Sequence, residues 1–449
     1  MSTNYETLAK KIVQRAQKKG AKEAEAFLQV GRSADVRVRD GEIEDLTQAT
    51  SKGVGIRVFV KNRVGFVWTS DFDNGALDTL IDRAIALAEM SAPNPLNGLP
   101  DRKDLGKFPD VGELFDKRVA DLPPDWKIKA AIEMEKVVRA FDPRIKTMDS
   151  VGAGEAVSEV YLASSAGVHG SYEGTSVYLY ASPVATDGTQ LQTSYWYDAK
   201  RFFEDLDTPE NVAKKAAARA VRLLGAKKVK SQKVPVIFDP TMAAGFVANI
   251  TRAMNGDAVF KKSSFLANKL GQKIAPAHVT IVDDGLRSRG LATSPFDGEG
   301  VPTRKTSLVE NGVLKAFLYD AFTARKAKTR TTGNAARGYQ SLPAIGVNNL
   351  VLEAGSRSPE EIIREVPNGL YVTAMLGHGA NTVTGEYSRG ANGLWIENGE
   401  LTRPVQEVTV AGALTDMLQN IDAVGSDLHF YGSTGAPTIR FKELTVSGE

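Results

Sequence analysis

The sequence predicts an α+β protein, with an antiparallel sheet and covering helices in the N-terminal region and a β-rich mixed-sheet or barrel-like C-terminal domain. Three observations support this prediction. The 449 residues exceed what one ordinary core accommodates. The 41 glycines, often next to Asn, Asp or Ser, indicate many turns. Runs with alternating apolar residues are interspersed with runs at helical spacing, a pattern typical of helices packed on sheets.

The first predicted domain, residues 1–112, begins with a helical stripe over residues 3–19 that ends at Gly20. Strand-like runs then occupy 34–39, 42–50, 54–61 and 64–70, and Asp40-Gly41 is a favoured hairpin turn. Helical spacing returns over 74–90. Residues 92–124 carry six prolines and no periodicity, so we expect a connecting segment there.

The middle α+β region, residues 113–230, contains a predicted helix over 126–141 and four alternating runs at 157–164, 168–172, 175–185 and 189–198. Thr208 and Pro209 are typical of the start of a helix, which we expect to run to 224. The lysine-rich run 226–233 could bind nucleic acid, but its shortness favours a solvated linker and a domain boundary.

The β-rich C-terminal domain, residues 231–449, opens with a strand at 234–238 and a helix from Asp239-Pro240 to Ala253. Two Glu-Asn-Gly turns, at Asn311-Gly312 and Asn398-Gly399, predict hairpins. A capping box opens a short helix at 358–361, and strands are expected at 370–376, 407–411 and 437–446.

Composition excludes several classes of protein. The net charge of +2 gives no reason to expect nucleic acid or an anionic membrane as a partner. No stretch approaches the roughly 20 apolar residues that span a bilayer, and the first 20 residues lack a signal-peptide core. The absence of cysteine removes disulfides and thiolate ligands. We therefore expect a cytoplasmic protein.

The residues alone predict no catalytic set. The four histidines, His169, His278, His378 and His429, have no partner at the spacing of a zinc-binding helix. The acidic runs 283–285 and 297–300 could supply paired carboxylates or cation ligands, but their Asp-Gly pairs favour turns. No Gly-x-Ser-x-Gly elbow or phosphate-binding glycine pattern is present.

A series of short motifs, in order along nearly the whole chain, resembles the TldD/PmbA (TldE) family. Each piece is weak by itself, but the ordered series is specific. The motifs are GVGIRVF at 53–59, IVDDG at 281–285, GEGVPTR at 298–304, VENGVLK at 309–315, TGNA at 332–335, VTGEYSRG at 383–390 and WIENG at 395–399.

In that family, the TldD type carries His-Glu-x-x-x-His on the helix after the first strand of the C-terminal domain. The turn that follows resembles Asn255-Gly256-Asp257 here, which places the motif at Val247, Ala248 and Arg252. Valine and alanine cannot bind zinc or transfer a proton, and a guanidinium stays cationic. A cysteine ligand of the TldD type has no counterpart, and residues 431–435 resemble a shortened version of its loop.

The resemblance therefore implies a TldE/PmbA-type chain with no metal and no catalytic residue of its own. It would pair with a zinc-containing TldD-type subunit to trim leader peptides and degrade short unfolded polypeptides, and the isolated chain could form a homodimer. Two alternatives remain open: a regulatory binding protein of the DNA gyrase modulator type, and a stand-alone hydrolase with an unrecognised site.

Substrate contact is expected in the glycine-rich segment 377–393. Its candidates are His378, Asn381, Tyr387 and Arg389, which offer donors, acceptors and a flat apolar face. Exposed backbone would hold varied peptides by strand addition. The alternative is that the glycines only permit tight turns.

Overall fold

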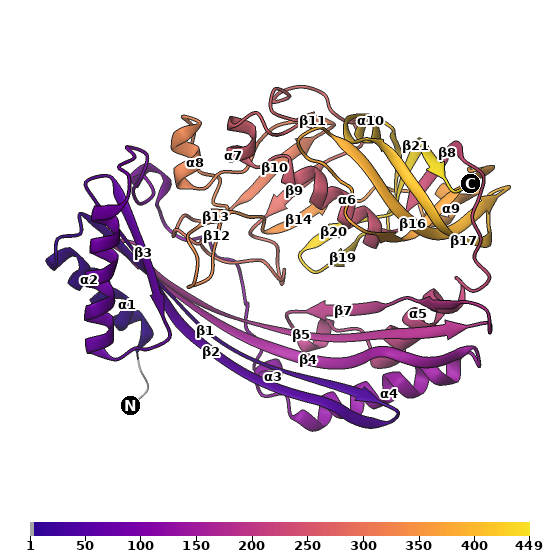
Figure 1. Cartoon of the computed structure of the whole chain (residues 1–449), viewed down its shortest axis with the longest axis horizontal. Helices are drawn as coiled ribbons and strands as arrows, with labels where there is room; N and C mark the ends of the chain where they lie inside the picture. The colour runs from indigo at the N-terminus through magenta and orange to yellow at the C-terminus, as the bar shows by residue number, and fades with distance from the viewer. Residues whose placement is uncertain (1–3) are drawn as a thin grey trace.

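One long, curved antiparallel sheet forms the N-terminal half of the protein (Figure 1). The computed structural model describes residues 4–449. The strand order is β3-β2-β1-β4-β5-β6, and β7 also pairs with β5. The strands are β1 (Glu23–Arg39), β2 (Glu42–Val60), β3 (Arg63–Thr69), β4 (Ile145–Ser164), β5 (His169–Thr186), β6 (Leu191–Thr193) and β7 (Trp196–Lys200). The predicted antiparallel sheet is confirmed.

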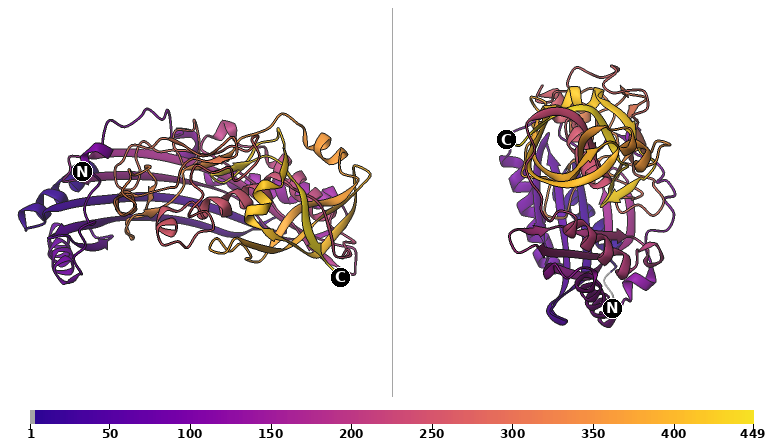
Figure 2. Two further views of the ribbon diagram at one scale, coloured as in Figure 1. Left: turned by 90° about the horizontal axis from the view of Figure 1, so that it is seen from above. Right: turned by 90° about the vertical axis from the view of Figure 1, so that its right-hand side faces the viewer.

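Helices cover this sheet, as predicted. Two of them, α1 (Tyr5–Lys18) and α2 (Asn74–Met90), bury apolar stripes against one end of the sheet. Two others, α4 (Pro124–Phe141) and α5 (Pro209–Val221), pack together near the opposite end, against the end of β1 and the start of β4. The C-terminal part lies over the face opposite α4 (Figures 1 and 2). Shorter elements are α3 (Lys117–Ala120), η1 (Arg102–Asp104) and η2 (Phe203–Asp205). Residue 3 of the first predicted helix lies outside the described residues.

The strands are longer than the sequence predicts. The runs 42–50 and 54–61 form the single strand β2, and 168–172 with 175–185 form β5. β4 begins at Ile145 rather than at 157, and the run 189–198 divides into β6 and β7. Gly53 does not end a strand: a Cβ there would lie 2.1 Å from the ring of Tyr339. The missing side chain of Gly53 leaves room for the Tyr339 ring, which comes from the C-terminal part, and close approach of another group is one reason for glycine within a strand.

The sheet is continuous across the first two predicted domains, because β1 pairs with β4 over most of its length. The proline-rich connection between them thus joins two parts of one sheet. The domain boundaries at 112 and 230 stay predictions. Residues 222–231 connect α5 to β8 (Gln232–Phe238), and they include most of the lysine-rich run.

The hairpin turns are confirmed at three predicted positions. Both residues of Asp40-Gly41, Asn311-Gly312 and Asn398-Gly399 have positive φ, between 51° and 80°. Such turns follow the twist of the strands they join, and Asn, Asp and Gly adopt them with least strain. The turn before β3 uses Lys61 and Asn62, with φ 49° and 63°, one residue earlier than expected.

The C-terminal part contains a closed five-stranded barrel, which confirms the barrel-like expectation. The order β17-β16-β15-β8-β21 returns to its start because β17 also pairs with β21, and β18 extends the sheet from β21. Figure 2 shows the ring end-on. Its interior holds Phe238, Phe246 and Phe441, with ring centroids 4.8–6.2 Å apart. The remaining strands are β15 (Asn368–Leu376), β16 (Glu386–Glu397), β17 (Glu400–Ala413), β18 (Ile421–Val424) and β21 (Ile439–Ser447).

A second mixed sheet lies beside the barrel, in the order β11-β10-β9-β14-β20-β19. Helix α6 (Pro240–Arg252) contacts strands of both sheets. The other elements are β9 (Ile281–Asp284), β10 (Lys305–Glu310), β11 (Val313–Leu314), β12 (Ala335–Ala336), β13 (Ala344–Ile345), β14 (Asn349–Leu352), β19 (His429–Tyr431), β20 (Thr434–Ala436), α7 (Gly256–Phe260), α8 (Ala321–Lys326), α9 (Pro359–Arg364) and α10 (Leu414–Gln419). Over residues 4–449, no helix has the length and apolar character needed to cross a bilayer.

Candidate functional site

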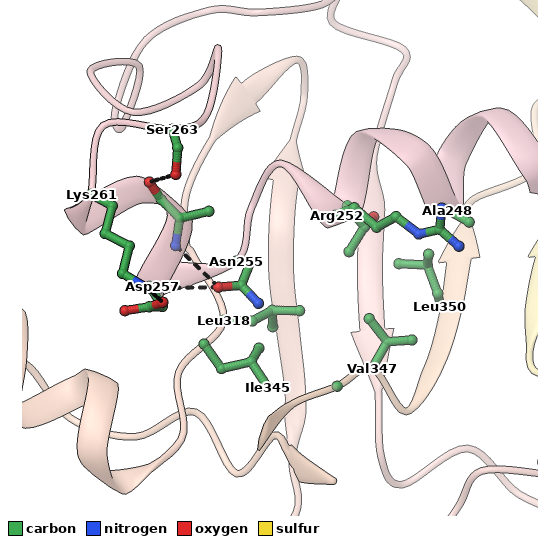
Figure 3. Close-up of a pocket in the computed structure, with 13 residues that line it drawn as sticks. Ala248, Arg252, Asn255, Asp257, Lys261, Ser263, Leu318, Ile345, Val347 and Leu350 are labelled. Atoms are coloured by element: carbon green, nitrogen blue, oxygen red, sulfur yellow. Dashed lines mark hydrogen bonds and ion pairs between the residues drawn. The ribbon is translucent and has the colours of Figure 1, made fainter. Parts of the chain in front are cut away.

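Helix α6 forms one wall of a pocket of about 550 Å³ (Figure 3). The helix begins as the sequence predicts: the Asp239 side chain accepts a hydrogen bond from the Met242 N–H at 2.9 Å, and Pro240 occupies the first turn. Asp239 also pairs with Arg219 of α5 at 2.9 Å. The start of α6 is therefore fixed to both halves of the protein.

The three positions of the family's zinc motif do not share one environment. Ala248 and Arg252, one helical turn apart, both line the pocket. Val247 is only 1% exposed and belongs to the apolar core. Arg252 is exposed at the end of α6, and its guanidinium lies beside Ala248 and Leu350 (Figure 3).

The opposite wall is formed by α7 and the loop after it (Figure 3). Asn255 caps α7, because its side-chain oxygen accepts hydrogen bonds from Asp257 and Ala258 at 3.0 and 3.2 Å. Asp257 pairs with Lys261 at 2.6 Å and with Lys326 of α8 at 2.9 Å. Burial acts against the charged carboxylate, but the two lysines outweigh it and lower the pKa of Asp257.

The donors near this pocket do not fit zinc. Hydrocarbon side chains and a cationic guanidinium occupy the positions where ligands would be needed. His429 stacks on Trp196 at 4.9 Å, and burial lowers its pKa. His169 begins β5, while His278 and His378 are exposed on other segments. Across the described chain, no group of three or more His, Cys, Asp or Glu residues is arranged to hold a metal ion.

The segment 377–393 is partly strand, contrary to its interpretation as one glycine-rich stretch. β16 begins at Glu386 and includes Tyr387 and Arg389. Tyr387 is only 3% exposed and packs edge-to-face on Phe246 at 6.4 Å, so its flat face is unavailable to a peptide. Its expected role as an apolar contact was wrong, because alternation along β16 turns it into the barrel.

The other candidates in this segment lie nearer the surface. His378 is exposed, and Arg389 is partly buried. The Asn381 side chain accepts hydrogen bonds from Val383 and Thr384 at 2.9 and 3.2 Å, which is the pattern of an Asx turn. Gly379 permits close packing, since a Cβ there would lie 1.8 Å from the Ser388 carbonyl oxygen. Turn structure accounts for Asn381, and it leaves His378 and Arg389 as contact candidates.

The acidic runs have structural environments in the interior. Asp283 lies in strand β9 rather than in a turn, is fully buried, and accepts hydrogen bonds from Asn334 and Asn348. Asp297 accepts three backbone hydrogen bonds, from Glu299, Val301 and Ala335, at 2.9–3.0 Å. Glu299 accepts from the Ala321 N–H at 2.8 Å. These carboxylates hold loops together and do not converge on an open site.

Glu299 also belongs to a buried ion network that the sequence analysis missed. Arg57 of β2 lies 2.9 Å from both Glu25 of β1 and Glu299, and Arg337 pairs with Glu25. None of the four is more than 8% exposed. The available signal was Arg57 inside the otherwise apolar strand motif at 53–59. The network connects the N-terminal sheet with the C-terminal part.

Comparison with known proteins agrees with this architecture. Three domains described as PmbA/TldA metallopeptidase domain 1, central domain and C-terminal domain match residues 24–88, 117–224 and 231–448. The chain is 32% identical to metalloprotease PmbA of Escherichia coli O157:H7, covering 92% of this chain and 90% of the relative. It is 32% identical to the PmbA homolog of Haemophilus influenzae, with 97% and 94% covered.

Solved structures extend the likeness to the whole fold. A proposed modulator of DNA gyrase from Bacteroides thetaiotaomicron superposes with a TM-score of 0.92 at 30% identity, with both chains covered completely. TldE from Thermococcus kodakarensis superposes with a TM-score of 0.91 at 26% identity, covering 98% of this chain and all of the other. The chain belongs to the PmbA/TldD family of metallopeptidases.

Proposed function

We propose that this chain is the non-catalytic, TldE-type subunit of a two-chain peptidase whose zinc is held by a TldD-type partner. One observation carries the proposal. The α6 pocket lies at the position of the family's zinc motif, and Ala248 and Arg252 line it where that motif has its glutamate and second histidine. Neither side chain can bind the metal or activate water.

The substrates we propose are leader peptides and short unfolded polypeptides in the cytoplasm. A subunit without catalytic groups contributes by enclosing the scissile bond, so that only thin, unfolded chains reach it. The curved sheet and the C-terminal part that lies over it provide extended surfaces for such an enclosure (Figure 1).

Pairing requires a large contact surface, since obligate interfaces commonly exceed about 2,000 Å² in total. The C-terminal part exposes Leu376 and Val383 by 51% and 52%. Apolar side chains at the surface support an interface there. The partner we propose is the TldD-type chain, and a homodimer is the alternative arrangement of the isolated protein.

Zinc content and cleavage test this assignment together. We expect the purified chain to retain no stoichiometric zinc after dialysis and to leave an unfolded peptide intact. Co-purified with a TldD-type chain, it should yield one zinc per pair and cleavage that a chelator abolishes. Near-equimolar zinc in the isolated chain, lost when His378 or His429 is replaced, would contradict the proposal. Cleavage by the isolated chain in chelator would indicate a stand-alone hydrolase instead.

A second candidate function is regulation of DNA gyrase, which the description of the Bacteroides structure favours. Binding to gyrase needs no peptidase partner. A pull-down with this chain as bait distinguishes the two functions: recovery of gyrase without any TldD-type chain supports regulation, and recovery of a TldD-type chain supports the peptidase.

The exposed part of segment 377–393 provides a further prediction. Replacement of His378 or Arg389 with alanine should slow peptide cleavage by the assembled pair, because both offer hydrogen-bond donors on a segment with accessible backbone. Assembly and zinc content should stay unchanged. The measurement is the initial rate at subsaturating peptide concentration. Full activity in both variants would show that the segment does not contact the peptide and that its glycines only permit tight turns.

A further inference from the structure

The α6 pocket carries an excess of positive charge. Arg252 contributes a guanidinium, and Figure 3 shows no hydrogen bond or ion pair from it to the residues that line the pocket. Asp257 is the acidic residue in this lining, and its carboxylate is held between Lys261 and Lys326. The lining thus has two cationic side chains, Arg252 and Lys261, against one acidic one, and Lys326 of α8 neutralises Asp257 further, which leaves the pocket suited to an anion.

The side chain of Asn255, which caps α7, provides a further hydrogen-bond donor. The Asn255 side-chain oxygen accepts from the first N–H groups of α7, which fixes the orientation of its amide. Figure 3 shows the amide nitrogen on the side away from that helix. Arg252 at the end of α6 and Asn255 at the start of α7, three residues apart, thus offer uncommitted donors to a group entering the pocket.

Apart from Thr251 and Ser263, the rest of the lining is apolar. Leu318, Ile345, Val347 and Leu350 form the side of the pocket below α6 (Figure 3). Ala248 contributes only a methyl group, which keeps the space beside Arg252 open. The volume of about 550 Å³ falls within the range of roughly 300–1,000 Å³ typical of small-ligand pockets. One or two residues of a peptide fit such a space, whereas a folded protein does not.

We propose that this pocket binds the C-terminal carboxylate of a peptide whose last side chain is aliphatic. Arg252 pairs with the carboxylate, since a guanidinium matches its two oxygens. The aliphatic lining takes the terminal side chain. The inference rests on the proposed function for its substrate class.

Equilibrium binding to the isolated full chain tests the proposal. The probe is fluorescein-labelled Ala-Ala-Ala-Leu, followed by fluorescence anisotropy. The free acid should bind at least about tenfold more tightly than the same peptide as a C-terminal amide, the scale of a charge-assisted hydrogen bond. A third probe, the amide of Ala-Glu-Ala-Leu, asks whether a side-chain carboxylate suffices. It should bind no better than the plain amide.

Two substitutions in the pocket should act in opposite directions. Arg252→Gln should weaken binding of the free acid about tenfold and leave binding of the amide unchanged. Asp257→Asn removes the acidic group and should strengthen binding of the free acid. The matched control is Arg364→Gln, another exposed arginine in the last turn of a helix, on α9. It should change neither affinity.

Equal affinity for acid and amide would overturn the proposal, as would Arg252→Gln and Arg364→Gln having the same effect. Better binding of the internal-glutamate amide would also overturn it. These outcomes are separable from failure of the proposed function. Zinc content and co-purification of a TldD-type chain decide that function, and neither measurement depends on Arg252 binding a carboxylate.

Discussion

Replacement of Arg57 with methionine is expected to lower the free energy of unfolding by about 3–5 kcal/mol, the cost of removing one partner from a buried ion pair. Arg57 lies 2.9 Å from Glu25 and from Glu299, and its side chain is 8% exposed. Methionine preserves much of the apolar stem but leaves two carboxylates facing each other without the cation between them. Urea denaturation, with the transition followed by tryptophan fluorescence, measures the change.

The control is Arg37→Met on the neighbouring strand. Arg37 pairs with Asp45 at 3.2 Å, but both side chains are more than 40% exposed. Water screens such a pair, so we expect little change in the unfolding midpoint. Similar losses in the two variants would show that the Arg57 network does not stabilise the fold beyond an ordinary surface pair.

The network joins the N-terminal sheet to the C-terminal part. Glu25 and Arg57 belong to β1 and β2, whereas Glu299 and Arg337 come from connections within the C-terminal part. Burial acts to raise the pKa of Glu25, but the guanidinium groups of Arg57 and Arg337 outweigh it and lower that pKa. The charged form is thus the stable one, and the ions fix the two parts relative to each other.

Local chemistry explains which parts of the fold were predictable. Turns such as Asn398-Gly399 require positive φ, and caps such as Thr208 satisfy nearby backbone N–H groups, so a few residues determine each. The continuous strands β2 and β5 were not predictable in this way. Gly53 and Gly174 suggest interruptions, yet they admit Tyr339 and Arg201, which approach from distant parts of the chain.

The candidate site was predictable only in part, for a similar reason. The motif alignment located the end of α6, and Ala248 and Arg252 do line a pocket there. Helix spacing alone did not reveal that Val247 turns into the core. The burial of Tyr387 depends on where β16 begins, and the far wall of the pocket comes from residues near 318 and 345. Such contacts form only on tertiary folding.

The carboxyl group of Asp297 predicts a pH-dependent loss of stability. Burial, followed by the negative charge of Glu299, raises the pKa of Asp297 to about 7 from its ordinary value of 3.8. Between these values the unfolded chain releases a proton that the folded protein keeps. Stability contributed by this group is therefore complete below about pH 4 and is lost as the pH rises to about 7.

Comparison of the wild type with Asp297→Asn isolates this effect. Asparagine does not titrate, so the cost of its altered hydrogen bonds to Glu299, Val301 and Ala335 is constant over this range. At about 1.4 kcal/mol per pKa unit, the wild type should lose up to about 4 kcal/mol relative to the variant between pH 4 and pH 7. Urea denaturation at several pH values in this range provides the measurement.

The matched control is Glu133→Gln, which removes an exposed carboxyl group on α4. Its curve should run parallel to that of the wild type. Parallel curves for the wild type and Asp297→Asn would show that the carboxylate is charged in the folded protein throughout, held by its three N–H donors. If the wild type instead gains stability relative to the variant as the pH rises, the pKa of Asp297 is lowered in the folded protein and not raised. The first result would show that the three N–H donors offset the effect of burial on the pKa of Asp297, and the second that they outweigh it.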